Sequence, residues 1–160
     1  MTIKAGDTIP AAKLYEMGTE GPVEISSKDL FSGKKVLLFG LPGAFTPTCS
    51  AQHVPGYLKF ESEIKAKGID EIVCFSVNDA FVMGAWGYDQ GVGDKIRMIG
   101  DGSAEFTKAA GLELDLNARG LGLRCQRFAM VVDDGKVTSI DIEPAGQFGI
   151  SSAESQLGKL

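Results

Sequence analysis

One cysteine stands out because of where the sequence places it. Cys49 ends the turn-rich segment Pro42-Gly43-Ala44-Phe45-Thr46-Pro47-Thr48-Cys49, at the point where a helix is expected to begin. The first turn of a helix has unpaired backbone N–H groups and the positive end of the helix dipole, and both stabilise a thiolate. Thr46 adds a hydroxyl three residues earlier. The sequence therefore predicts a nucleophilic thiol at position 49.

A reactive thiolate also needs a cation, and two kinds are available. His53, the only histidine, follows Cys49 by four residues and would share its helix face. It could act as the base of a Cys/His pair, although a packed or interface histidine is the more common role. The segment from Gly120 to Phe128 supplies two arginines, Arg124 and Arg127. Arg124 is charged at any working pH and its fork of donors suits an oxygen or a thiolate, but a surface salt bridge is its ordinary role.

The other two cysteines have simpler interpretations. Cys74 lies in the apolar run Glu71–Val77, where a buried small residue is the slightly favoured reading over a redox role. Cys125 is adjacent to Arg124, but neighbours along a strand point to opposite faces, which favours a structural role. Three cysteines without a C-x-x-C pair or a Cys/His cluster predict neither a disulfide framework nor a metal site.

The elements that must position these side chains alternate along the chain. Apolar runs predict strands at 34–40, 71–77 and 96–99, with a short strand near Leu14 and Tyr15. Helices are expected over 50–67, kinked by Pro55 and closed by Gly68, over 80–88 after Asp79, from Ser103 as N-cap, and over 152–157. Asp133-Asp134-Gly135 predicts a hairpin between strands 127–132 and 136–142.

This order predicts an α/β fold, a mixed central sheet with helices on both faces, compatible with a thioredoxin-like fold. The length of 160 residues suits one domain, residues 1–160. A net charge of −5 disfavours nucleic acid and anionic lipid as partners. The N-terminal residues contain no long apolar segment, so we expect a soluble, cytoplasmic protein rather than an exported or membrane protein.

Taken together, these motifs closely resemble the peroxiredoxins, in particular the atypical type II subgroup that includes plant enzymes and peroxiredoxin-five-like proteins. The resemblance spans nearly the full length. Its carriers are the signature Pro42-x-x-x-Thr46-x-x-Cys49, the segments His53–Gly56 and Phe75–Asp79, the segment from Phe81 to Gly87, and the stretch from Leu112 to Arg124. It implies a thiol-dependent peroxidase for hydrogen peroxide and small alkyl hydroperoxides, with no metal or other cofactor.

The resemblance also implies a role for each residue of the site. Cys49 would be the peroxidatic nucleophile that becomes a sulfenic acid. Thr46 would hydrogen-bond the thiolate and the peroxide, Arg124 would stabilise the thiolate and the developing charge, and Pro42 would shape and shield the pocket. Donors aimed at that charge are the catalysis that a small neutral substrate requires.

The second half of the cycle is less determined by the sequence. Cys74 matches the second cysteine of the plant enzymes and is a possible resolving residue, but the C-terminal segment 146–152 lacks the resolving cysteine of the mammalian branch. We therefore expect resolution by glutathione and glutaredoxin, or by thioredoxin. The resemblance further implies a homodimer, with Phe45 and the segment around Trp86 at the interface.

Two other classes of protein remain as alternatives. A redox sensor or chaperone-like protein could use the same thiol to relay oxidation to a partner, and would show no sustained turnover. A thioredoxin-type disulfide reductase would need C-x-x-C at the helix, where this chain has Thr46-x-x-Cys49.

Overall fold

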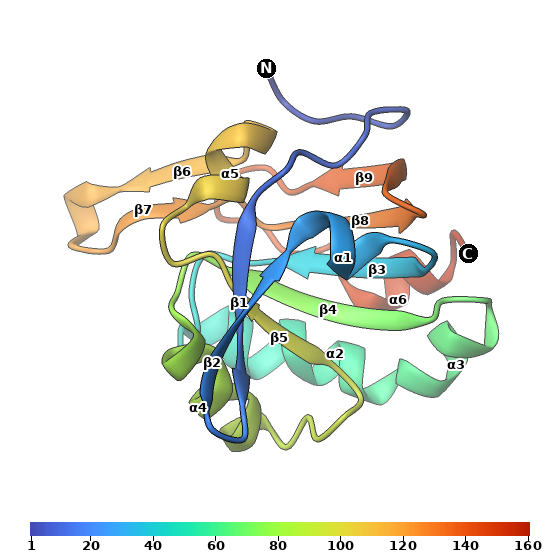
Figure 1. The fold of residues 1–160 in the computed structure, drawn as a ribbon, viewed down its shortest axis with the longest axis horizontal. Coiled ribbons are helices and arrows are strands. Elements are labelled where there is room, and N and C mark those ends of the chain that lie inside the picture. The colour runs from blue at the N-terminus through green and yellow to red at the C-terminus, as the bar shows by residue number, and fades with distance from the viewer.

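The computed structural model describes residues 1–160. Its main feature is a seven-stranded sheet in the order β2-β1-β5-β4-β3-β8-β9, with a separate two-stranded ribbon of β6 and β7 (Figure 1). The strands are β1 Lys13–Gly18, β2 Gly21–Ser26, β3 Lys35–Gly40, β4 Glu71–Ser76, β5 Arg97–Gly100, β6 Glu113–Leu116, β7 Gly122–Cys125, β8 Phe128–Asp133 and β9 Lys136–Ile142. The α-helices are α1 Ser27–Phe31, α2 Val54–Lys59, α3 Glu61–Ala66, α4 Ala80–Gln90, α5 Glu105–Ala110 and α6 Ala153–Leu157.

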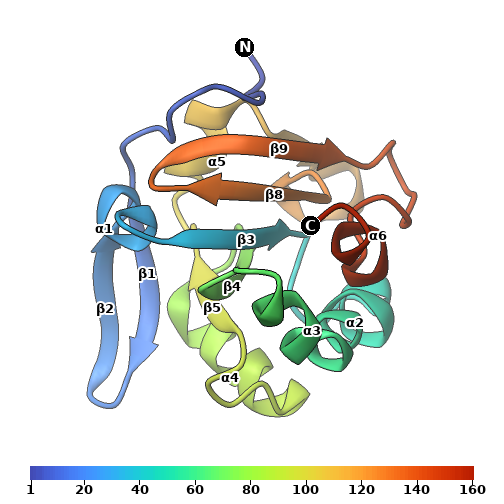
Figure 2. The same cartoon turned by 90° about the vertical axis from the view of Figure 1, so that its right-hand side faces the viewer.

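The sheet is mixed, and both of its faces are covered. β4 runs parallel to β3 and β5, whereas β8 is antiparallel to β3 and β1 is antiparallel to β5. Side chains alternate along β3: Val36 and Leu38 join one apolar cluster, and Leu37 and Phe39 join the other. Helices α1 and α5 cover the first cluster, and α2, α3, α4 and α6 gather over the second (Figure 2). The predicted α/β architecture is confirmed.

Most of the expected elements occur close to their predicted positions. Asp79 caps α4, since its Oδ1 accepts a hydrogen bond from Val82 N at 2.8 Å. Asp134 and Gly135 both have positive φ, of 49° and 80°, as a tight two-residue hairpin turn requires. The residue before α6, Ser152, accepts a hydrogen bond from Ser155 N.

Other details of the prediction were wrong or incomplete. The sequence patterns missed the hairpin strand β2, which lacks a continuous apolar run, and the four-residue strands β6 and β7 of the ribbon. Ser103 does not cap α5: the helix begins at Glu105, and the buried carboxylate of Asp101 accepts from Phe106 N and Thr107 N. An aspartate four residues before the helix can cap it because Ala104 adopts a left-handed turn, with φ of 57°.

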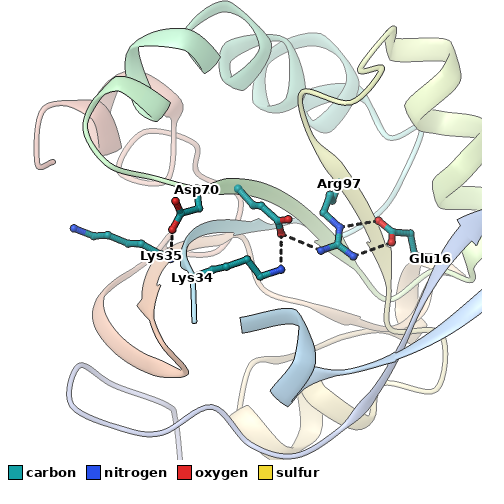
Figure 3. Close-up of polar contacts among 6 residues, drawn as sticks. Glu16, Lys34, Lys35, Asp70 and Arg97 are labelled. Atoms are coloured by element: carbon teal, nitrogen blue, oxygen red, sulfur yellow. Dashed lines mark hydrogen bonds and ion pairs between the residues drawn. The ribbon is translucent and has the colours of Figure 1, made fainter. Parts of the chain in front are cut away.

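An ion-pair network joins four elements at one end of the sheet. The guanidinium of Arg97 on β5 donates to Glu16 on β1 at 2.8 and 3.0 Å (Figure 3), and to Glu71 on β4 at 2.9 Å. Lys34, directly before β3, is 3.4 Å from the same Glu71 carboxylate. These side chains are about a quarter to a third exposed, so each pair adds at most about 1 kcal/mol. The network links side chains from β1, β4 and β5 and from the residue before β3.

None of the helices has the length and apolar character required to cross a bilayer.

Candidate active site

The segment before Cys49 is anchored to the ends of two adjacent strands. After β3 ends at Gly40, the backbone O of Leu41 accepts a hydrogen bond from Ser76 Oγ at the end of β4, at 3.0 Å. Further along both segments, Asn78 Oδ1 accepts a hydrogen bond from Ala44 N at 3.0 Å. In both bonds a side chain at or after the end of β4 holds the backbone of the turn, so its course depends on the parallel pairing of β3 and β4.

The sequence predicts one helix over residues 50–67, kinked by Pro55. The structure instead divides this segment into several helical pieces. Residues 49–53 form a π-helical turn, in which Val54 N bonds to Cys49 O, five residues back. Pro55 follows directly and has no N–H to continue an α-helical ladder, so the predicted irregularity near Pro55 is confirmed. A second interruption at Phe60, with φ of −101° and ψ of 9°, separates α2 from α3. Cys49 therefore lies in the first turn of an irregular helix and is fully buried.

The cation beside the thiol is Arg127 and not Arg124. Arg127 Nη2 lies 3.2 Å from Cys49 Sγ. Strand β8 pairs antiparallel with β3 so that Phe128 faces Gly40, and this register brings the preceding Arg127 to the point where β3 delivers the turn. The prediction of Arg124 was wrong about this contact because both arginines precede β8 and the sequence does not reveal the register.

Arg124 instead binds the backbone of the turn that precedes Cys49. It lies on β7, where its Nη1 donates to Pro42 O at 3.2 Å and its Nε donates to Leu121 O at 2.8 Å. A Cβ at Gly43 would lie 2.6 Å from Arg124 Nη1, which explains why glycine occupies that position. Arg124 and Pro42 are thus close together at the site, but the contact uses the Pro42 carbonyl rather than the thiol.

His53 is buried and orients Arg127. Its Nε2 lies 3.1 Å from the backbone O of Ser151, which can only accept, so Nε2 carries the hydrogen. Its Nδ1 is therefore the acceptor for Arg127 Nη1, at 2.7 Å. Burial, followed by the nearby charge of Arg127, lowers the pKa of His53 to about 3. The interpretation as a packed histidine is supported, and the Cys/His base is not, because the free lone pair is already occupied.

The burial of neutral His53 predicts acid-sensitive stability. The unfolded chain binds a proton at His53 below a pKa of about 6.5, but the folded chain does so only near 3. The contribution is therefore complete above about pH 6.5 and falls as the pH drops. Between pH 7.5 and 4.5 we expect the wild-type protein to lose about 2–3 kcal/mol more unfolding free energy than His53→Gln. Urea denaturation at both pH values measures this, and equal losses in the two proteins would contradict it.

Thr46 lies in the turn before Cys49, and Pro42 lines a cavity whose wall also includes Arg127. Thr46 Oγ1 donates to Gly43 O at 2.7 Å, so its hydrogen is engaged within the turn and its lone pairs are available. The cavity has a volume of about 300 Å³, and Pro42, Thr48 and Arg127 contribute to its wall. Arg127 thus joins the cavity to Cys49, and Thr46 precedes Cys49 in the same turn.

A C-terminal loop that sequence reasoning overlooked closes the site. Phe148 packs on both cationic and aromatic neighbours: its ring centroid is 5.7 Å from Arg127 Cζ and 5.0 Å from the His53 ring. Glu143 Oε2 holds this loop by accepting from Gly149 N, Ser151 N and Ser151 Oγ at 2.6–2.8 Å. In the sequence, Glu143 is followed by a stretch with several glycines and serines, which is typical of a loop held by a carboxylate. This pattern does not indicate which element the loop contacts.

The two remaining cysteines are buried thiols. Burial raises the pKa of Cys74 well above its ordinary value and raises that of Cys125 to about 12. Cys125 Sγ donates to Leu41 O at 3.2 Å, on the opposite face of β7 from Arg124. None of the three cysteines is in a disulfide. Neither Cys74 nor Cys125 has an environment that favours its thiolate.

Comparison with known proteins agrees with this geometry. The Redoxin family model matches residues 4–157. Peroxiredoxin-2B of Arabidopsis thaliana is 48% identical over 99% of this chain and 98% of its own length. The crystal structure of reduced Prx3 of Vibrio vulnificus in complex with H2O2 superposes with a TM-score of 0.95 at 49% identity, covering 99% of each chain.

A further similar structure, from Burkholderia cenocepacia, carries a provisional thioredoxin reductase name. It is 53% identical with a TM-score of 0.98, and covers 100% of this chain and 99% of that one. This chain has no C-x-x-C pair, and the thiol that contacts a cation is Cys49. The thioredoxin-like fold predicted from the sequence is the fold of these relatives. This chain therefore belongs to the peroxiredoxins and is a thiol-dependent peroxidase.

Proposed function

We propose that the Cys49 thiolate attacks the terminal oxygen of a hydroperoxide. A sulfur–oxygen bond forms while the O–O bond breaks, so Cys49 becomes a sulfenic acid and the leaving oxygen takes a proton to give water or an alcohol. The observation that carries this proposal is the 3.2 Å contact between Arg127 Nη2 and Cys49 Sγ in the first turn of a helix. The similar Vibrio vulnificus structure is a complex with H2O2, which supports hydrogen peroxide as the substrate here.

Each group around the sulfur has a distinct role in this step. Arg127 donates to the sulfur and, as the O–O bond lengthens, to the oxygen on which negative charge collects. Thr46 accepts a hydrogen bond from the peroxide, because its own hydrogen is engaged with Gly43 O. Pro42 limits access of water to the sulfur, while Arg124 holds the Pro42 carbonyl in place.

Thr46 provides a test of this arrangement. Thr46→Val keeps the shape of the side chain but removes the oxygen, and we expect the rate constant for Cys49 oxidation to fall about a hundredfold. Thr46→Ser keeps the oxygen and should retain the rate within about threefold. Rapid mixing with peroxide followed by alkylation of unreacted Cys49 measures both variants. If the valine and serine variants react equally fast, the hydroxyl has no such role.

We propose that a thiol from outside the chain reduces the sulfenic acid. Burial raises the pKa values of the Cys74 and Cys125 thiols, and the loop over the site has Ser151 and Ser152 rather than a cysteine. Glutathione with glutaredoxin is the favoured reductant, and thioredoxin is the alternative. Sustained peroxide consumption with each reductant distinguishes them, whereas a single round of oxidation without turnover would favour a redox relay.

A homodimer is the proposed assembly. The side chains of Phe45, Phe81 and Tyr88 are 54%, 63% and 92% exposed and come from the active-site turn and α4. Trp86 lies between them in sequence but is buried, with its Nε1 donating to Ser50 Oγ at 3.0 Å. The interface would therefore use the neighbours of Trp86 and not its ring.

One domain spanning residues 1–160 and a cytoplasmic location stay predictions from the sequence.

A further inference from the structure

The arginines of this chain are distributed unevenly. The chain has four, and Arg97 is held by Glu16 and Glu71 in the strand network. The other three, Arg119, Arg124 and Arg127, form no ion pair and all lie near the mouth of the active site. In a chain with a net charge of −5, cations left without carboxylate partners in one place favour an anionic ligand there.

Arg119 is the member of this group without an assigned task. It ends the short 3-10 turn Asn117–Arg119, is exposed, and makes no side-chain hydrogen bond. Arg124 is held by two carbonyls and Arg127 by His53 and Cys49. Arg119 nevertheless lines the same 300 Å³ cavity as Arg127, the residue that contacts Cys49, so its free guanidinium is available to a ligand there.

The carboxylate in the cavity wall does not neutralise these arginines. Glu143 is the acidic residue lining the cavity, and its Oε2 accepts three hydrogen bonds from its own loop. Those donors lower the pKa of Glu143 against the effect of burial, so the carboxylate stays charged while serving the loop. An incoming carboxylate would therefore find Arg119 unoccupied.

We propose that Arg119 binds a carboxylate of the glutathione that reduces Cys49. This inference rests on the proposed peroxidase cycle and concerns its second half. Arginine presents two parallel N–H donors that match a carboxylate, and Gln126 and Gln147 in the same wall offer amides for a peptide backbone. The bound carboxylate would hold the peptide in the cavity whose wall includes Arg127, the residue that contacts Cys49 Sγ.

The composition of the cavity wall favours such a peptide over a long-chain hydroperoxide. Apart from two prolines, its apolar residues are Leu114, Ala145 and Phe148, and the rest is polar, charged or glycine. A volume of about 300 Å³ is at the small end for ligand pockets, which start at roughly 300 Å³. An acyl chain would need a larger and more apolar wall, whereas a short peptide thiol meets donors and acceptors on most sides.

The chemical steps balance with two equivalents of this thiol. The first thiolate attacks the sulfur of the Cys49 sulfenic acid, an S–S bond forms, and hydroxide leaves and is protonated to water. A second thiol attacks the mixed disulfide, which returns Cys49 as a thiol and releases the oxidised peptide disulfide. Arg119 takes part in neither bond change and is a binding residue for the first step.

Glutathione and glutathione diethyl ester test the proposal, because they share the thiol and the peptide but differ in their carboxylates. The measured quantity is the ratio of kcat/KM for glutathione to kcat/KM for the ester, at saturating hydrogen peroxide. We expect Arg119→Ala to lower this ratio about tenfold, mainly through KM, and Arg119→Lys to lower it less. Lys95→Ala removes an exposed charge outside the cavity and should leave the ratio unchanged.

The outcomes separate this inference from the proposed function. Loss of the free Cys49 thiol after peroxide is added, with no reductant present, reports the first half of the cycle alone. If wild-type Cys49 does not react, the peroxidase mechanism itself fails. If Cys49 reacts but Arg119→Ala changes the rates with glutathione and its ester by the same factor, the carboxylate site is overturned while the peroxidase stands.

Discussion

Arg127→Ala is expected to slow the reaction of Cys49 with hydrogen peroxide about a hundred- to a thousandfold, the usual cost of removing one donor aimed at developing charge. Its guanidinium is the one that touches the sulfur, at 3.2 Å, and His53 Nδ1 holds it there through a 2.7 Å hydrogen bond. Removing it leaves the buried sulfur without a cation. Quenched-flow mixing, with the remaining free Cys49 counted by mass spectrometry, measures the rate constant.

Arg124→Ala is the matched control for this prediction. It also removes an arginine side chain, on β7, but this side chain bonds only to Pro42 O and Leu121 O. We therefore expect the rate constant for Cys49 oxidation to fall about tenfold or less. Arg127→Lys should recover part of the rate, because an ammonium supplies charge but cannot span Cys49 and His53 as a planar fork does. A larger effect at Arg124 than at Arg127 would reverse the assignment.

Cys49→Ser is expected to abolish peroxide turnover, whereas Cys74→Ser and Cys125→Ser should each retain most of it. The hydroxyl of serine is a far weaker nucleophile than a thiolate and cannot form a sulfenic acid. Burial raises the pKa values of Cys74 and Cys125, so neither supplies a thiolate in the folded protein. Steady-state peroxide consumption with glutathione and glutaredoxin measures all three variants.

The stability of each variant provides the control. Cys125→Ser keeps a donor for Leu41 O, and Cys74→Ser places a hydroxyl in an apolar cluster, at a cost of about 1–3 kcal/mol. Thermal unfolding therefore has to be compared before activities are. Two results together would contradict reduction by an outside thiol: a quantitative Cys49–Cys74 disulfide in peroxide-treated wild-type protein, and loss of turnover in a stable Cys74→Ser variant. They would show that Cys74 resolves the sulfenic acid.

Much of the architecture was predictable because it depends on local patterns. Continuous apolar runs identified β3 and β4, Asp79 identified the start of α4, and Asp134-Gly135 identified the hairpin of β8 and β9. Each of these signals acts within a few residues. The hairpin strand β2 and the ribbon of β6 and β7 escaped because they are stabilised by pairing with a partner strand rather than by an apolar pattern of their own.

The sequence by itself determined which thiol is reactive, since the turn, Thr46 and the helix start that surround Cys49 lie within eight consecutive residues. Only the tertiary structure decided which cation serves it. The antiparallel register of β8 on β3 places Phe128 opposite Gly40 and so delivers Arg127 to Cys49, while Arg124 turns to Pro42 O from a separate ribbon. Strand register depends on packing between segments more than 80 residues apart, and no local pattern at Arg124 or Arg127 encodes it.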